Sequence, residues 1–212
     1  MLHYRKGFVV AVGITVGGER EILGTWIINS ESYEAWDECL GELKGRGLKG
    51  VRYVVSDNNK GLCGAIAKHF QGVIWQRCQV HFMRNFIGKL SQAEKGEGIG
   101  LLKEVFAATT KEEAKYRLGK VGEFLKRRKK ENVWLWLEES IEETLAVLDL
   151  PIEHRKKMKS TNMLERFNQE LKRRSRVVRI FPNEQSCLRL LTALCQETSE
   201  SWGNRNYLKE VS

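Results

Sequence analysis

Near the N-terminus the apolar residues fall in two runs separated by glycines. The first run, F-V-V-A-V-G-I-T-V at 8–16, is rich in β-branched residues and almost free of polar ones, which is typical of a strand covered on both faces. Gly17 and Gly18 predict a hairpin turn, and residues 19–28 predict a second strand. The two runs therefore predict an antiparallel strand pair.

The elements that follow alternate between helix and strand. They are a helix that Ser30 could cap, a strand at 51–55, a helix through Phe70, a strand at 73–76 and a helix through Ile87. The order strand, strand, helix, strand, helix, strand, helix predicts an α/β fold built on a mixed sheet with flanking helices.

Between residues 94 and 149 the strand-like runs stop and the spacing of apolar residues is helical. Thr110 and Glu113 have the spacing of a capping box, and the apolar residues of 134–148 fit one face of a further helix. This region is expected to be an all-α insertion in the α/β layer. The basic run 126–130 inside it fits a solvated face better than a DNA contact.

Composition narrows the class of protein. At 212 residues, of which 42% are hydrophobic, the chain can bury one substantial core, and its length fits one domain or one domain with an insertion. The 36 lysines and arginines outnumber the 27 acidic residues, and the net charge of +9 favours a polyanionic partner.

Neither a membrane span nor a disulfide framework is expected. No apolar run approaches the roughly 20 residues that a transmembrane helix needs, and the N-terminal residues do not resemble a signal peptide. The five cysteines are odd in number and irregularly spaced, which indicates reduced thiols. We therefore expect a cytoplasmic protein that does not act on a membrane.

Asp57 follows the strand-like run V-R-Y-V-V-S and precedes the turn N-N-K-G. Side chains at the carboxyl ends of strands in α/β sheets face the crevice where ligands bind, so Asp57 is a candidate metal ligand. The alternative is structural, with Asp57 capping the turn or the helix that follows. The local sequence fits both interpretations.

Glu165 opens a basic helix in S-T-N-M-L-E-R-F-N-Q-E-L-K-R-R. Its spacing from Asn162 also fits a capping-box-like start, in which the carboxylate bonds a backbone N–H. Phe167 and Leu171 lie on a core stripe, while cations crowd the end of the helix. The candidates for phosphate contacts there are Lys172, Arg173, Arg174, Arg176 and Arg179. Hard divalent cations need oxygen ligands, so Glu165 and Asp57 are suitable in type for Mg²⁺ or Mn²⁺.

Cys78 and His81 have the C-x-x-H spacing of half a zinc site. No second ligand pair lies nearby in the sequence, so a structural zinc ion is the weaker interpretation. His81 and Arg84 are three residues apart on one helix face and could both reach phosphate, whereas Cys78 could be a small buried apolar residue. His154, in a basic loop before the Glu165 helix, could contact phosphate or be solvated.

Four stretches carry the motifs of a known family. They are G-E-R-E-I-L-G-T-W, G-L-K-G-V-R-Y-V-V-S-D-x-x-x-G-L, W-Q-R-C-Q-V-H-F-M-R-N and S-T-N-M-L-E-R-F-N-Q-E-L-K-R-R-S-R-V-V-R-I-F-P-N. Together they resemble the Mutator-type family of bacterial insertion-sequence transposases. The resemblance implies a ribonuclease-H-like core, an Asp-Asp-Glu site for Mg²⁺ or Mn²⁺, and a helical insertion before the Glu. Asp57 then matches the second Asp, Glu165 the Glu, and Cys78 with His81 the family's C-x-x-H signature.

Two positions depart from the family pattern. The family's first Asp lies on a strand before the one at 8–16, yet residues 1–7 contain no Asp or Glu. The family's usual His two residues after the second Asp is here Asn59, which should alter only the surroundings of a metal. The family's N-terminal DNA-binding region would also precede residue 1. The resemblance thus implies the C-terminal part of a transposase, truncated and inactive alone because one metal ligand is missing.

The resemblance also predicts domains and partners. Residues 1–90 would form the first part of the catalytic core, 91–158 the helical insertion, and 159–212 the core helices that carry the Glu. The intact enzyme would cleave DNA and transfer strands during transposition of an insertion sequence, as a homo-oligomer on element ends and target DNA. Two alternatives remain: a non-catalytic DNA-binding or oligomerising remnant that modulates a full-length relative, and a ribonuclease-H-like nuclease with other substrates.

Overall fold

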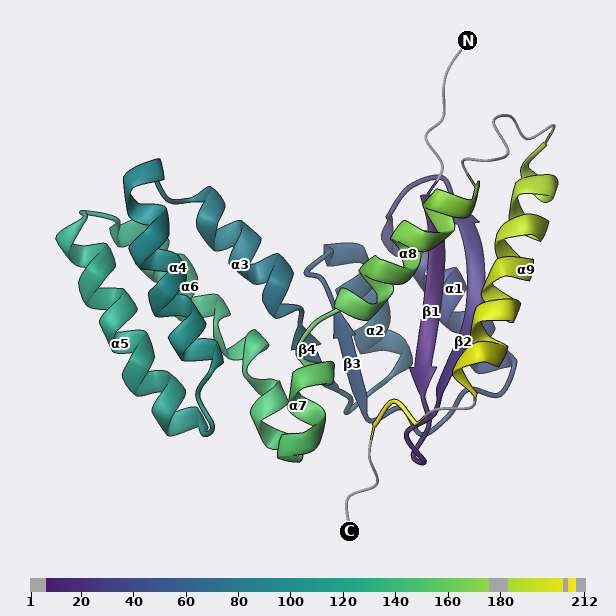
Figure 1. Ribbon diagram of the computed structural model, residues 1–212, viewed down its shortest axis with the longest axis horizontal. Coiled ribbons are helices and arrows are strands. Elements are labelled where there is room, and N and C mark those ends of the chain that lie inside the picture. The colour runs from purple at the N-terminus through teal and green to yellow at the C-terminus, as the bar shows by residue number, and fades with distance from the viewer. Residues whose placement is uncertain (1–6, 176–182, 204–205, 209–212) are drawn as a thin grey trace. The chain divides into compact units, whose positions relative to one another are not determined.

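The computed structural model (Figure 1) divides into two compact units whose segments alternate along the chain. The first unit contains Met1–Arg52, Asn58–Val73 and Asn162–Ser212, and the second contains Tyr53–Asp57 and Ile74–Thr161. The structure describes residues 7–175, 183–203 and 206–208. Within those ranges, no helix is long and apolar enough to span a membrane.

An antiparallel strand pair forms the sheet of the first unit. β1 (Gly7–Ile14) pairs with β2 (Arg20–Ile28) across a turn that contains Gly18, whose φ of 82° favours a residue without a Cβ. A shift in the pairing register leaves Leu23 of β2 as a bulge. The predicted hairpin is confirmed.

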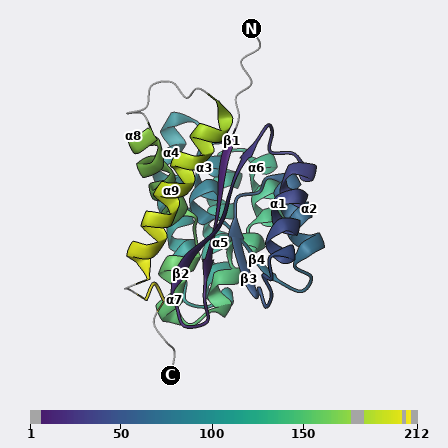
Figure 2. The ribbon, with the colours of Figure 1, turned by 90° about the vertical axis from the view of Figure 1, so that its right-hand side faces the viewer.

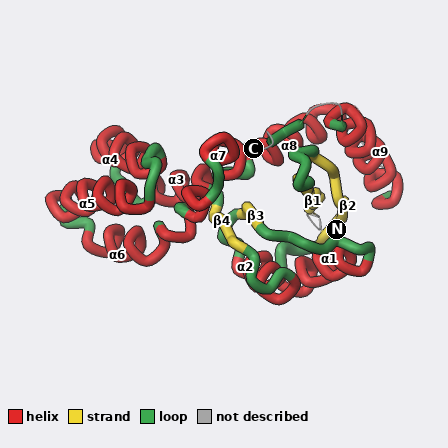
Figure 3. The backbone as a smooth tube through the Cα atoms, turned by 90° about the horizontal axis from the view of Figure 1, so that it is seen from below, coloured by secondary structure: helices red, strands yellow, loops and turns green. Residues whose placement is uncertain are grey.

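Helices cover both faces of this strand pair. On one side lies α1 (Tyr33–Gly45), with α2 (Lys60–His69) packed beside it, and on the other lie α8 (Asn162–Ser175) and α9 (Glu184–Trp202) (Figures 2 and 3). Burial of apolar side chains between α8, α9 and the strands stabilises this layer. The residues of that cluster are Phe8, Val10, Ile22, Phe167, Leu171, Leu191, Cys195 and their partly buried neighbours.

The second unit begins with a short parallel strand pair. β3 (Tyr53–Ser56) pairs with β4 (Ile74–Arg77) from Tyr53 opposite Ile74 to Ser56 opposite Arg77. Parallel strands need a crossover connection, and α2 lies between them in the sequence. Helix α3 (Gln79–Gly88) starts two residues after β4 ends.

The rest of the second unit is helical. Its elements are α4 (Gln92–Phe106), α5 (Lys111–Arg127), α6 (Glu131–Ser140), the 3-10 turns η1 (Glu142–Thr144) and η2 (Ala146–Asp149), and α7 (Ile152–Met158). Phe82, Phe86 and Phe124 are fully buried in the core between these helices. Phe82 stacks on Trp136, with ring centroids 4.9 Å apart.

The chain is an α/β protein, as predicted, while the single mixed sheet of a ribonuclease-H-like fold stays a prediction. In the described parts of the chain, backbone hydrogen bonds join strands only as the pairs β1–β2 and β3–β4. The glycine hairpin leads to the antiparallel pair, and the connection through α2 leads to the parallel pair. No described strand belongs to both pairs. The predicted domain boundaries stay a prediction.

Two predicted helix starts need correction. Helix α1 is capped by Ser32 rather than Ser30, because the Ser32 hydroxyl accepts a 3.3 Å hydrogen bond from the backbone of Ala35. Thr110 caps α5 as predicted, but the Glu113 carboxylate bonds the N–H of the preceding residue, Thr109, instead of that of Thr110. The Glu113 carboxylate therefore binds the N–H one residue before the N-cap, and not that of the N-cap itself as in a regular capping box.

The helix predicted across 134–148 is wrong beyond Ser140. The Ser140 hydroxyl donates to the carbonyl of Trp136, and the Thr144 hydroxyl donates to the carbonyl of Ile141, both at 2.6 Å. Such local side-chain bonds compete with regular helix, and the chain continues as 3-10 turns.

His154 lies in helix α7, not in the predicted loop. The neighbouring Arg155 is largely structural, because its guanidinium donates to three backbone carbonyls. These belong to Leu148 and Leu150, both at 2.8 Å, and to Thr109 at 2.6 Å. One cation of this basic segment is thereby bound to the protein's own backbone.

Candidate functional site

Asp57 directly follows β3, at the carboxyl end of the parallel strand pair, and its side chain is half-buried. The alternative in which Asp57 caps the next helix is wrong, because Asn59 is the N-cap of α2. The Asn59 side-chain oxygen accepts from the N–H of Leu62 at 3.0 Å, and its amide nitrogen donates to Glu31 at 3.2 Å. Asp57 thus lies in the short segment between the end of β3 and Asn59, the N-cap of α2.

Partly buried hydrogen bonds hold the backbone at Asp57. The hydroxyl of Ser56, which is 6% exposed, accepts from the indole N–H of Trp75 at 2.8 Å and donates to the carbonyl of Asp57 at 2.8 Å. Because the Ser56 hydroxyl both accepts and donates in a partly buried region, these two hydrogen bonds restrain the peptide that follows Asp57. Trp75 belongs to β4, so the neighbouring strand helps to position the candidate ligand.

Cys78 is fully buried at the N-cap of α3, as the structural interpretation predicts. Its N–H donates to the carbonyl of Ser56 at 2.7 Å, and its sulfur accepts from the N–H and the hydroxyl of Thr161, both at 3.4 Å. His81 and Arg84 lie one turn apart on α3, the first half-buried and the second exposed. Their contact with phosphate stays a prediction.

Sequence reasoning missed the structural role of Gln76. This side chain is fully buried; its amide nitrogen donates to the carbonyls of Arg77 and Thr144, and its oxygen accepts from the N–H of Val147 and the hydroxyl of Tyr53. The bonds tie the end of β4 to the turns after α6. The only sequence signal was an uncharged polar residue inside an apolar strand, W-Q-R-C.

Arg77, the next residue of the motif, is also structural. Its side chain is 4% exposed, donates to Glu143 at 2.9 Å and lies over the ring of Phe82, with 4.8 Å from the guanidinium carbon to the ring centroid. A cation bound in this way is not available to phosphate.

Glu165 is the fourth residue of α8 and its side chain is half-buried. The predicted core stripe is confirmed, because Phe167 and Leu171 on the same helix are buried against α9 and the strand pair. Glu165 belongs to the first unit and Asp57 to the second. Among the residues that the structure describes, no three or more His, Cys, Asp or Glu side chains group as a metal site, for zinc or for magnesium.

The basic end of α8 is partly neutralised by carboxylates. Arg173 makes two bonds to Glu170, at 2.8 and 2.7 Å, and Arg174 bonds Glu170 at 3.1 Å and Glu197 of α9 at 2.9 Å. These hydrogen bonds lower the pKa of Glu170 and raise the pKa of both arginines. Lys172 is exposed. The remaining candidates, Arg176 and Arg179, lie outside the described residues.

The basic run 126–130 behaves as the solvated face that the sequence favours. Arg127 and Arg128 lie 3.5 and 3.4 Å from Glu97, and Lys130 lies 3.5 Å from Glu94. Carboxylates of α4 thus compensate three of these cations.

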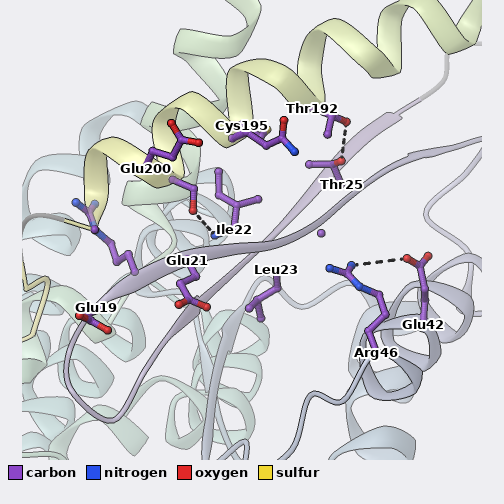
Figure 4. A pocket seen from close by; sticks show the side chains of 15 residues that line it. Glu19, Glu21, Ile22, Leu23, Thr25, Glu42, Arg46, Thr192, Cys195 and Glu200 are labelled. Carbon is purple, nitrogen blue, oxygen red and sulfur yellow. Dashed lines mark hydrogen bonds and ion pairs between the residues drawn. The ribbon is translucent and has the colours of Figure 1, made fainter.

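A polar groove follows β2 between α1 and α9 within the first unit (Figure 4). Its volume is about 620 Å³, and its charged lining residues are Glu19, Arg20, Glu21, Glu42, Arg46 and Glu200. Arg46 lies 3.7 Å from Glu42, and Arg20 is held between the rings of Trp202 and Tyr207. The carboxylates in excess would repel phosphate, and none of the predicted site residues lines the groove.

The described residues define an α/β protein in which a buried hydrogen-bonded scaffold supports one acidic residue at a strand end, while a second begins a basic helix. Comparison with known families agrees with the sequence motifs. The chain belongs to the Mutator family of transposases, because the model of that family, "Transposase, Mutator family", matches residues 4–205.

Individual relatives are transposases of insertion sequences. The chain is 45% identical over 202 residues to the transposase for insertion sequence element ISRM5 of Rhizobium meliloti strain 1021, covering 95% of this chain and 50% of the relative. It is 37% identical over 208 residues to the transposase for element IS256 in transposon Tn4001 of Staphylococcus aureus, covering 96% and 53%. The chain thus spans about half the length of the curated relatives it matches.

Proposed function

We propose that this chain carries catalytic residues of a DDE-type transposase, with a ribonuclease-H-like core that cleaves DNA and joins it to a target. The observation that carries the proposal is the family match across residues 4–205, together with Asp57 at the carboxyl end of β3 and Glu165 in the first turn of α8. These are the two element ends at which the family motifs place acidic residues. DNA and further copies of the protein are the proposed partners.

The residues present are suitable in type for Mg²⁺ or Mn²⁺. Asp57 and Glu165 both offer carboxylate oxygens and both are half-buried, so each can be shielded from bulk water while still reaching a ligand. When bound, such a cation would increase the nucleophilicity of a water or a DNA 3′-hydroxyl and stabilise charge on the phosphate. In this scheme the two carboxylates hold the ion, and the two hydrogen bonds of the Ser56 hydroxyl restrain the Asp57 backbone.

The chain's cations would hold the DNA. His81 and Arg84 on α3 and Lys172 on α8 are the proposed phosphate contacts, and they would position the backbone without reading its sequence. Arg173 and Arg174 would contribute less, because each already binds a carboxylate.

Mn²⁺ binding to the whole chain tests the proposal, with free Mn²⁺ measured by electron paramagnetic resonance. Asp57→Asn and Glu165→Gln should each weaken binding by about tenfold or more, since each removes a ligand charge. The matched controls are Asp149→Asn, which removes a carboxylate half-exposed beside Lys111, and Glu123→Gln on the exposed face of α5. Both controls should bind Mn²⁺ as the unaltered protein does.

Equal Mn²⁺ affinity in all four variants would contradict the catalytic proposal. Retained binding to duplex DNA in such a chain would then favour the non-catalytic DNA-binding alternative. Circular dichroism of each variant separates loss of a ligand from loss of fold, because replacing one half-buried carboxylate by an amide of the same shape should leave the helices intact.

A further inference from the structure

Cys78 lies where two chain segments of the second unit meet. It is fully buried between the end of β4 and the start of α3, and its N–H donates to the carbonyl of Ser56 at 2.7 Å. Ser56 is the last residue of β3 and immediately precedes Asp57. The backbone of Cys78 therefore fixes the strand end that carries the first proposed ligand.

The sulfur of the same residue binds a different segment. The N–H and the hydroxyl of Thr161 both donate to Cys78 Sγ, each at 3.4 Å. The next residue, Gln79, strengthens this attachment, because its N–H donates to the carbonyl of Lys159 at 3.0 Å. Thr161 directly precedes α8, and Glu165 lies about one helical turn further along that helix.

We propose that Cys78 is a positioning residue within the second unit: its backbone holds the strand end that precedes Asp57, and its thiol holds Thr161, the last residue before the Glu165 helix. The role rests on the proposed function of Asp57 and Glu165 as metal ligands. Cys78 itself binds no metal in this scheme, since its sulfur already accepts two hydrogen bonds and its side chain has no exposed surface.

A thiol suits this position for physical reasons. The first N–H groups of a helix lack partners within the helix, so a buried acceptor beside residue 161 satisfies a group that would otherwise be left unpaired. Sulfur is large enough to fill the buried space and to accept from two donors of one residue, although each bond is weak. Alanine keeps the apolar character but removes the acceptor, whereas serine retains a smaller acceptor.

Hydrogen–deuterium exchange of the whole chain, without metal, tests the attachment. In Cys78→Ala the amides of residues 161–166 should exchange about tenfold faster, the factor expected for the loss of one or two weak hydrogen bonds. Cys78→Ser should restore most of the protection. The matched control is Cys39→Ala, which empties a similarly buried thiol site, 3% exposed, on α1 and should leave residues 161–166 unchanged.

Thr161→Val gives an independent test if Cys78→Ala folds poorly. It removes the hydroxyl donor at nearly constant volume, and its effect should not add to that of Cys78→Ala, because both break the same contact. Unchanged exchange at 161–166 in either folded variant would overturn the proposal. The proposal would also be overturned if amide exchange in α5 became faster by the same factor as at residues 161–166, because that pattern indicates general destabilisation.

Mn²⁺ affinity then tests whether the attachment serves the site. Cys78→Ala should weaken Mn²⁺ binding by about tenfold, as loss of a group that orients a ligand does, with Cys78→Ser closer to the unaltered protein. Faster exchange with unchanged Mn²⁺ affinity, in a chain whose affinity does depend on Asp57, would overturn the positioning role alone. An affinity independent of Asp57 and Glu165 would overturn the proposed function and the positioning role with it.

Discussion

The side-chain amide of Gln76 donates to the backbone carbonyl of Thr144 over 2.8 Å, although the two residues are 68 positions apart. Gln79 donates to the same carbonyl at 3.0 Å. The motif W-Q-R-C-Q therefore connects β4 to the turns that end the helical part of the second unit. In this family motif, the two glutamines therefore have a structural role.

Replacing Gln76 by methionine should lower stability strongly. The substitution preserves the length of the side chain but leaves the N–H of Val147 and other buried groups without a partner, at a cost of about 2–4 kcal/mol. The midpoint of urea unfolding measures the effect. Gln71→Met, at an exposed position, is the control and should stay within about 0.5 kcal/mol of the unaltered protein. Similar midpoints for both variants would contradict the structural role of Gln76.

The capping box at the start of α4 should make stability depend on pH. Hydrogen bonds from the hydroxyl and the backbone N–H of Ser91 hold the pKa of Glu94 below its ordinary value. A depressed pKa means that the stabilisation is present above the unfolded pKa of about 4.3 and is lost as pH falls through the lower folded value. Urea unfolding of the unaltered protein and of Glu94→Gln should therefore differ at pH 7 and converge in acid. If the difference in stability between the two proteins stayed constant from pH 7 into acid, ionisation of Glu94 would not be its cause.

Buried thiols should resist alkylation in the folded protein. Burial raises the pKa of Cys39 and Cys195 to about 11, so at pH 8 both remain protonated and unreactive. Cys78 is fully buried as well, whereas Cys63 and Cys187 are half-exposed. Iodoacetamide labelling followed by mass spectrometry should find Cys63 and Cys187 modified first. Labelling of Cys195 as fast as Cys63 would show that α9 is not packed as described.

Local sequence predicted the elements of the α/β part better than their ends. The strand before Asp57 and the hairpin at Gly18 follow from runs of apolar residues and from glycine chemistry, which are local properties. The choice of Ser32 over Ser30 as a helix cap depends on backbone angles, because both serines offer the same hydroxyl.

Contacts between distant residues account for most of what the sequence did not predict. The apolar stripe continues past Ser140, but the regular helix ends there; in addition to the local hydroxyl bonds, the distant residues Gln76 and Gln79 bind the carbonyl of Thr144. Similarly, the run of cations on α8 gave no sign that Arg174 bonds Glu197 on α9. Charge pattern predicts an exposed basic surface and leaves open which cations are compensated.

Because carboxylates compensate the charge of Arg174, we expect Lys172 and Arg174 to differ in how much each contributes to the salt dependence of DNA binding. Lys172→Gln should reduce the slope of log affinity against log salt by about 1, because one phosphate contact is lost. Arg174→Gln should change the slope less, since its guanidinium lies 2.9 Å from Glu197 and 3.1 Å from Glu170, and a compensated cation releases fewer counterions from DNA.

Fluorescence anisotropy with a labelled duplex at several salt concentrations measures both slopes, and Lys103→Gln on the exposed face of α4 is the control. Equal slope changes for Lys172 and Arg174 would mean that DNA displaces the carboxylates, and no change for either would remove the end of α8 from the proposed DNA interface.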